Sequence, residues 1–174
     1  MKTAFRTSLI VASTIALSAC ATYKTAVPEG YTGPTAILKD SSDVYSMSKA
    51  DIFYTLSVNG DEIDNALFTT RRVNEGRGAI MAVQKVQRPI PAQPLKVSVS
   101  ARTTYAAPIM AMANTVYGVK GIVSFTPEVD KVYVVRGKLS ETYSAVWIEE
   151  EISKTVVGEK IEAQGSAKLG FFEK

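Results

Sequence analysis

The chain contains 174 residues, of which 20 are basic and 17 acidic, and it has one cysteine and no histidine. A chain of this length forms one ordinary domain and buries a sizeable core without disulfides. The missing histidine excludes the usual catalytic triads and most zinc sites, and the near balance of charge gives no basis for a nucleic-acid partner, which requires a concentrated basic face.

The N-terminal segment has the composition of a secretory signal. Residues 1–6 carry two positive charges and no acid, and an apolar run follows over residues 7–17. A charged start, a short apolar stretch and small residues before a cleavage point are typical of such signals. The run is too short for a bilayer span, which needs about 20 apolar residues. We therefore predict export, with a buried apolar helix as the alternative.

The segment ends in Leu17-Ser18-Ala19-Cys20, which resembles the lipobox of bacterial lipoproteins. The resemblance implies that the bond before Cys20 is cut and that the thiol is diacylated. Lipoproteins carry two or three acyl chains, and two or more chains anchor a protein stably, whereas one gives only reversible binding. Acylation also explains a single thiol in an exported protein and leaves no cysteine for a disulfide or a metal. The alternative is an ordinary secretory signal that ends in a chance cysteine.

The residues after the cysteine bear on localisation. Ala21 and Thr22 follow it, and no aspartate stands next to it. In lipoproteins of enteric-type bacteria an aspartate there acts as an inner-membrane retention signal, so the resemblance implies the outer membrane, with the protein facing the periplasm. Loss of Lys2 and Arg6 with the signal leaves 18 basic and 17 acidic residues, a net charge of +1.

The chain divides into three parts, which are a lipoprotein signal peptide over residues 1–19, a lipidated N-terminus and tether over residues 20–33, and a β-sandwich domain over residues 34–174. The tether has no sustained period and contains Pro28, Gly30 and Gly33. Fully extended, it reaches at most about 40 Å. The alternative is that Tyr23 and Tyr31 dock their amphipathic rings on the domain or at the membrane interface.

The first half of the domain predicts strands joined by turns. Residues 52–58 are β-branched and aromatic with a partial period of two, and they run into Asn59-Gly60, the strongest short-range hairpin signal. Residues 63–73 follow as the return strand, and residues 79–86 form another strand after a glycine-rich turn. Three prolines within residues 89–94 then break pairing and mark a loop.

The second half contains the clearest strand, residues 95–102, in which apolar and polar side chains alternate. This alternation predicts a sheet with one face toward water. The predicted core-facing residues are Leu95, Val97, Val99 and Ala101. Residues 116–125 form a strand in which Gly118 and Gly121 favour a bulge. Further strands are predicted at residues 132–139, 145–150 and 155–161, with the last two paired, and the one short-helix candidate is residues 108–114.

Short strands at regular spacing predict an all-β fold, a single β-sandwich (immunoglobulin-like or similar) of about seven to nine strands. We expect Trp147 in its core, with Phe125 and Tyr133 nearby. The run from residue 127 to residue 157 combines a proline turn, Val-Tyr-Val-Val, Ala-Val-Trp-Ile-Glu and a hairpin. This pattern resembles the closing half of small envelope lipoproteins of unknown function. The resemblance covers about the last third of the chain and implies no activity.

Two acidic clusters are candidates for chemistry. Asp61, Glu62 and Asp64 offer the oxygen ligands that calcium takes. They lack the spacing of an EF-hand loop, so solvated hairpin carboxylates are the favoured interpretation. Residues 149–151 are three glutamates, and a carboxylate pair can serve glycoside hydrolysis. Alternation places Glu149 and Glu151 on one face and Glu150 on the other, which favours an exposed strand end.

A basic cluster occupies the second quarter of the chain. It comprises Arg71, Arg72, Arg77, Lys85 and Arg88. Such a cluster can meet anionic lipid headgroups or phosphate. Solubility charges on an edge strand are the favoured interpretation.

Residues 105–113 form nine consecutive uncharged residues between two predicted strands and include two of the five methionines. Loops normally run over the surface and are polar. This stretch is therefore either a plug that caps the core or a surface for a partner or ligand, since Met-rich surfaces adapt to different partners. The candidate partner- or ligand-binding residues are Tyr105, Pro108, Ile109, Met110 and Met112.

These features predict a membrane-anchored envelope lipoprotein that acts as a non-enzymatic accessory or interaction module. The expected partners are the membrane, through acyl chains on Cys20, and an envelope protein; no catalytic residue, metal, cofactor or nucleic acid is predicted. The alternative is a carrier that holds a small apolar ligand or lipid between its sheets, with residues 105–113 at its mouth. A weaker alternative is a hydrolase, although Gly165-Ser166 lacks the rest of a Gly-x-Ser-x-Gly motif.

Overall fold

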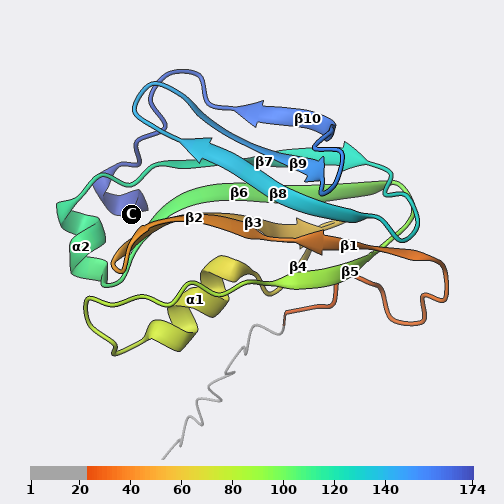
Figure 1. Cartoon of the computed structure of the whole chain (residues 1–174), viewed down its shortest axis with the longest axis horizontal. Helices are drawn as coiled ribbons and strands as arrows, with labels where there is room; N and C mark the ends of the chain where they lie inside the picture. The colour runs from red at the N-terminus through yellow and green to blue at the C-terminus, as the bar shows by residue number, and fades with distance from the viewer. Residues whose placement is uncertain (1–22) are drawn as a thin grey trace, which may run out of the picture.

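A computed structural model of the protein describes residues 23–174 (Figure 1). The predicted signal peptide, the acylation site Cys20 and the next two residues lie outside the described residues. Within residues 23–174 the chain is mostly β structure, arranged in two sheets of five strands each. The prediction of an all-β fold is confirmed at this level.

The first sheet has the strand order β10-β9-β8-β1-β5. Its strands are β1 (Thr35–Lys39), β5 (Gln87–Pro91), β8 (Val132–Leu139), β9 (Ser144–Glu150) and β10 (Val156–Glu162). β1 pairs with β8 in parallel, and the other neighbouring strands of this sheet are antiparallel. The predicted strands at 132–139, 145–150 and 155–161 are therefore confirmed, and so is the pairing of the last two.

The second sheet has the order β2-β3-β6-β7, and the short β4 pairs with β3. Its strands are β2 (Ser41–Ser46), β3 (Lys49–Val58), β4 (Asp61–Glu62), β6 (Leu95–Tyr105) and β7 (Gly118–Phe125). All of its pairs are antiparallel. Asn59 and Gly60 both have positive φ, 51° and 91°, which is the turn geometry that makes Asn-Gly a hairpin signal.

Helical structure is confined to short segments of the described chain. These are α1 (Ala66–Asn74), α2 (Pro108–Ala113) and the 3-10 helix η1 (Phe171–Glu173). α2 confirms the predicted short helix, with a proline in its first turn. Figure 1 shows α1 below the second sheet, whereas α2 and the C-terminal segment lie together at one end of the molecule.

One hydrophobic cluster joins the two sheets. The four alternating residues of β6 that the sequence assigns to the core are buried in it, with exposed fractions of 2% or less. Leu38, Val135, Val146 and Ile148 meet them from the first sheet. Burying an aliphatic side chain of this size stabilises a fold by about 1.5–3 kcal/mol. The inward faces of both sheets thus share one core.

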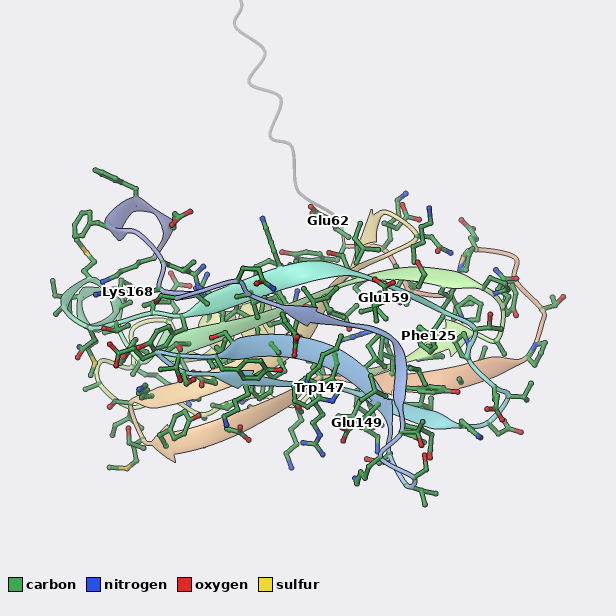
Figure 2. All side chains as sticks on the ribbon, turned by 90° about the horizontal axis from the view of Figure 1, so that it is seen from above. Glu62, Phe125, Trp147, Glu149, Glu159 and Lys168 are labelled. Carbon is green, nitrogen blue, oxygen red and sulfur yellow. The ribbon has the colours of Figure 1, made fainter. Side chains whose placement is uncertain are left out.

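Trp147 is not part of this core, contrary to the prediction. The alternation of β9 turns Val146 and Ile148 inward and leaves Trp147 half-buried on the other face. There its Nε1 donates to Glu149 Oε2 at 2.9 Å, and Lys160 Nζ lies 4.3 Å from the ring centroid (Figure 2). Phe125 and Tyr133 do pack together, with ring centroids 5.2 Å apart.

The predicted strand at residues 63–73 is wrong, because helix α1 begins at Ala66. The Asn65 side chain accepts hydrogen bonds from the backbone N–H groups of Leu67 and Phe68. This is the N-cap arrangement that satisfies the first free donors of a helix. Leu67 packs on the outward face of β3, which the helix partly covers.

The stretch between α1 and β6 also differs from prediction. Residues 79–86 form no strand and instead run past the helix, where Asn74 Oδ1 accepts from Ala82 N at 2.8 Å. The following segment, predicted as a loop because of its prolines, is β5 at the edge of the first sheet. Edge strands tolerate proline because one side of the strand needs no N–H donor for a neighbour.

The two glycines of β7 leave room for neighbouring side chains rather than forming a bulge: Gly118 lies against Leu169 of the C-terminal segment and Gly121 against β10. The β6–β7 register is regular, and a Cβ on Gly121 would lie 2.8 Å from Ile161 Cγ2 of β10. The register shift occurs in β10 instead, between Val157 and Ile161. Gly158 lies in this interval with φ of 67°, a conformation that glycine adopts without strain.

A buried ion pair holds α1 in place. Arg88 donates to both carboxylate oxygens of Asp40, at 2.9 and 2.8 Å, and the two side chains are 9% and 0% exposed. The same carboxylate accepts from Thr55 N of β3 and from Ala66 N in the first turn of α1. Asp40 thus connects the end of β1 to β3, to β5 and to the helix.

Residues 23–33, which fall within the predicted tether, contact the domain. Tyr23 packs against Phe68 of α1 with ring centroids 5.6 Å apart. Lys24 N donates to Glu62 O at 3.0 Å. Tyr31 donates its hydroxyl to Pro34 O at 2.8 Å. Both tyrosines therefore dock on protein in this structure.

Candidate functional site

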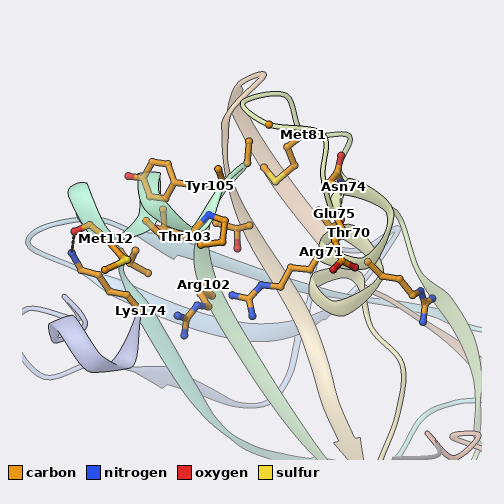
Figure 3. A pocket seen from close by; sticks show the side chains of 18 of the residues that line it. Thr70, Arg71, Asn74, Glu75, Met81, Arg102, Thr103, Tyr105, Met112 and Lys174 are labelled. Atoms are coloured by element: carbon orange, nitrogen blue, oxygen red, sulfur yellow. Dashed lines mark hydrogen bonds between the residues drawn. The ribbon is translucent and has the colours of Figure 1, made fainter.

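A cavity of about 880 Å³ opens between α1, the end of β6 and α2 (Figure 3). Its walls also include the loop after α1 and Lys174 at the end of the chain. None of its lining residues belongs to the first sheet. The cavity therefore lies beside the second sheet, not between the sheets, where the shared hydrophobic core fills the space.

Part of the uncharged stretch forms the apolar wall of this cavity. Tyr105, Pro108 and Met112 line it, whereas Ile109 and Met110 do not. Ile109 instead projects into solvent, 68% exposed. The stretch adopts this position because Tyr105 ends β6 and donates its hydroxyl to Thr115 O at 2.9 Å, closing the loop that holds α2. Met81 adds a second methionine from the opposite side.

Three cationic side chains from distant parts of the chain converge on the cavity. Figure 3 shows Arg71 extending from α1 toward Arg102 of β6, with Lys174 on the other side of Arg102. Arg102 Nη2 donates to Glu173 O at 2.8 Å, and Lys174 Nζ donates to Asn114 O at 2.7 Å. These bonds fix the C-terminal segment against α2 and leave most of the Arg102 donors unused.

In the part of the chain that the structure describes, Arg71 has no carboxylate partner. It forms no ion pair within residues 23–174, in contrast to Arg72, which pairs with Asp64 at 3.2 Å. Arg71 is exposed to solvent, yet partial desolvation by neighbouring protein atoms, together with repulsion from Arg102, lowers the pKa of Arg71. Among the described residues that line the cavity, Glu75 is the one carboxylate. The cavity therefore carries an uncompensated positive charge.

The cavity wall also contains a hydroxyl that the fold does not use. Thr104 lines the cavity and is 5% exposed, and its Oγ1 has no hydrogen-bond partner within residues 23–174. It lies two residues after Arg102 on β6, and therefore on the same face of the strand. Buried polar atoms are nearly always paired, so this hydroxyl marks unused hydrogen-bonding capacity beside the two arginines.

The basic cluster predicted from the sequence does not form one surface. Arg71 lines the cavity, Arg72 is paired at its rim, and Arg88 is buried with Asp40. Lys85 belongs to a separate depression, with Lys39 and Arg136. Arg102 and Lys174 complete the cationic wall, and sequence reasoning missed both. Their spacing in the sequence carries no signal, because only the position of α1 brings Arg71 to them.

The first acidic cluster is divided among structural contacts. Asp61 forms an ion pair with Lys24. Asp64 accepts from Asn65 N at 3.0 Å and from the hydroxyl of Thr69 at 3.2 Å. Within residues 23–174, no group of three or more acidic, cysteine or histidine residues is placed to hold a metal ion.

The three consecutive glutamates also have separate partners. Glu149 accepts from Trp147 and Arg136, and Glu151 pairs with Lys39 at 2.9 Å. Glu150 accepts from the backbone N–H groups of Ile152 and Ser153 at 3.0 and 2.7 Å. Hydrogen bonds from Ser153 and Ile152 lower the pKa of Glu150 from its ordinary 4.5 to about 2. The glutamates stabilise a turn rather than forming a carboxylate pair.

One buried carboxylate lies near the cavity. Asp51 of β3 is 3% exposed and accepts from the hydroxyl groups of Thr103, at 2.7 Å, and Tyr45, at 3.0 Å. Burial raises the pKa of Asp51, and the two hydroxyl donors oppose that rise. Thr103 lines the cavity and separates Asp51 from it, so this carboxylate supports the wall.

Comparison of the chain with protein-family models, with curated proteins and with solved structures finds no match. Among the helices of residues 23–174, none has the length and apolar character needed to cross a membrane.

Proposed function

We propose that the protein is a membrane-anchored, non-enzymatic accessory module of the cell envelope that works by holding a ligand in the cavity beside α1. The observation that carries this proposal is the cavity itself. Its volume of about 880 Å³ lies within the 300–1,000 Å³ typical of small-molecule sites. Its walls combine an apolar side with a few convergent polar groups, as such sites do.

The proposal treats the described domain as a single β-sandwich, immunoglobulin-like or similar. The shared cluster of side chains from the inward faces of both sheets supports this arrangement. In a sandwich the loops and helices at the ends of the sheets are free to form binding sites while the core stays intact. The cavity, built from α1, α2 and the end of β6, is of this kind.

The anchor is proposed at Cys20, on the strength of the lipobox resemblance, and the location is the outer membrane facing the periplasm. Tyr23 docks on Phe68, and three residues span at most about 10 Å. Acyl chains on Cys20 would therefore hold α1 close to the bilayer surface, so a cavity lined by α1 would be within reach of molecules in the membrane.

A protein partner is the second candidate, because apolar side chains are exposed at the same end of the molecule. Ile109 of α2 is 68% exposed, and Phe171 and Phe172 of η1 are 57% and 98% exposed. Exposed apolar groups of this size mark interaction sites when they gather in a patch.

Native mass spectrometry of the full-length acylated protein, extracted gently from its own envelope, tests the proposal. A discrete small-molecule adduct beyond the mass of the acyl chains is the expected result. A stoichiometric complex with another protein and no small adduct would favour the second candidate. A bare acylated monomer would contradict both.

A further inference from the structure

We propose that the ligand is an amphiphilic anion, whose carboxylate or phosphate group lies between Arg71 and Arg102 while its apolar part packs against Met81 and Met112. This inference rests on the proposed function, in which the cavity is the binding site. It adds the chemical class of the ligand and the residues that recognise it.

Electrostatics favours an anion at this position. Arg71 and Arg102 both line the cavity, and Arg102 lies close enough to lower the pKa of Arg71. No carboxylate forms an ion pair with either arginine within residues 23–174. An anionic group between them would convert that repulsion into two attractions. The planar guanidinium fork is also suited to carboxylate and phosphate oxygens, which it can bind with two parallel N–H donors.

The polar groups around the arginines are consistent with this position. Thr104 is on the same face of β6 as Arg102, and its buried Oγ1 has no hydrogen-bond partner within residues 23–174. Glu75 also lines the cavity and follows Arg71 by one helical turn, but within residues 23–174 it forms no ion pair with either arginine. Lys174 Nζ is already used by the carbonyls of Met112 and Asn114, which leaves the two arginines as the principal anion-binding groups.

The remaining wall requires a ligand with an apolar body. Met81 and Met112 line the cavity from different sides (Figure 3). Pro108, Ala111 and Val116 add further apolar surface to its lining. A bare inorganic anion would leave these surfaces in contact with water, whereas an alkyl or similar group would cover them at about 25 cal/mol per Å². The flexible methionine side chains can adapt to the shape of that group.

Binding to the full-length acylated protein in neutral phosphatidylcholine nanodiscs tests the assignment. Four probes are titrated by calorimetry, with empty nanodiscs as the blank: octanoate, octyl phosphate, 1-octanol and inorganic phosphate. We expect at least one of the two amphiphilic anions to bind about tenfold or more tightly than 1-octanol, because hydrogen bonds to charged groups contribute that much or more. The tighter of the two identifies the ligand's headgroup as carboxylate or phosphate.

Arg71→Gln and Arg77→Gln form a matched pair of variants. Each removes one positive charge from the same region, but Arg77 does not line the cavity. Arg71→Gln should weaken binding of the amphiphilic anion about tenfold or more and leave the affinity for 1-octanol unchanged, since only the anion uses the arginine. Arg77→Gln should change neither affinity by more than about twofold. Arg71→Lys keeps the positive charge but loses the planar guanidinium fork, so its anion affinity should lie between those of Arg71→Gln and Arg77→Gln.

The other outcomes overturn the inference in distinguishable ways. Equal affinity for 1-octanol and the anions, or equal effects of the two glutamine variants, would show that the cavity takes apolar ligands without recognising charge, and the proposed function would stand. Inorganic phosphate binding as tightly as octyl phosphate would overturn the amphiphilic class. If none of the probes bound while the native protein carried an adduct, this inference would fail alone. If none bound and no adduct were present, the proposed function would fail with it.

Discussion

Two arginines near helix α1 have opposite surroundings: Arg71 belongs to the helix, and Arg88 belongs to β5. Arg88 is buried against Asp40 with two hydrogen bonds to its carboxylate, whereas Arg71 faces the cavity together with Arg102, which repels it. A buried charge normally requires a partner. Arg88 therefore serves the fold, whereas Arg71 is exposed to solvent and needs no countercharge for folding.

The largest expected effect comes from breaking the paired arginine. Asp40→Asn keeps the shape of the side chain but leaves Arg88 buried without a countercharge, and removing one partner of a buried pair costs about 3–5 kcal/mol. Urea unfolding followed by far-UV circular dichroism measures the free energy of unfolding. Asp61→Asn is the control, because it breaks an exposed pair with Lys24 and should cost less than about 1 kcal/mol. Equal losses in the two variants would show that the Asp40 network does not hold the fold.

The next effect tests helix α1, which carries Arg71. Asn65→Ala removes the acceptor for the first turn of α1 and should lower the free energy of unfolding by about 1–2 kcal/mol. Asn65→Ser retains a capping oxygen and should lose less. Because Arg71 is on this helix, Asn65→Ala should also increase hydrogen exchange of the α1 amides. A loss of stability with unchanged exchange in α1 would contradict the capping role.

Replacement of Arg71 should change the stability of the fold much less than replacement of Arg88. Arg71→Gln should leave the free energy of unfolding within about 0.5 kcal/mol of the starting protein, or raise it, since it removes a repulsion and no hydrogen bond. The same urea experiment measures it, with Arg88→Gln as the contrast. A loss from Arg71→Gln comparable to that from Arg88→Gln would mean that Arg71 also has a structural partner, and the comparison on which the ligand proposal depends would be lost.

A comparison of β6, β9 and α1 shows how far local sequence patterns predict this fold. The alternation of β6 predicts its core-facing residues correctly, because one face of that strand is buried against a single core. β9 is buried on one face and only half-buried on the other, so hydrophobicity alone places Trp147 in the wrong layer. The helix at Ala66 has a local signal in Asn65, whose capping role outweighs the β-like composition of the residues after it.

The cavity follows from none of these local patterns. Tyr105, Pro108 and Met112 were predictable from an uncharged stretch, since such a stretch must be covered or offered to a ligand. Arg102 and Lys174 were not predictable, because their proximity to Arg71 depends on where α1 packs and on how Glu173 and Asn114 receive their side chains. Charge clusters in sequence and charge clusters in space are different sets of residues here.

The smallest expected effect concerns Glu150, whose negative charge is stabilised by hydrogen-bond donors of a turn and not by an arginine. The pKa of Glu150 is lowered from 4.5 to about 2, first by hydrogen bonding to Ser153 and then by the backbone donor of Ile152. A carboxylate with a lowered pKa stabilises the folded state at pH values above about 4.5, and this contribution is lost as the pH falls toward 2, where the group is protonated in both states. Glu150→Gln should therefore flatten the dependence of unfolding free energy on pH between about 4.5 and 2, while leaving the anion affinity of the cavity unchanged.

Glu159→Gln, at an exposed position of β10, is the matched control for loss of one negative charge. An equal change of slope in both variants would show that net charge, and not the turn that Glu150 closes, sets the acid sensitivity of the domain.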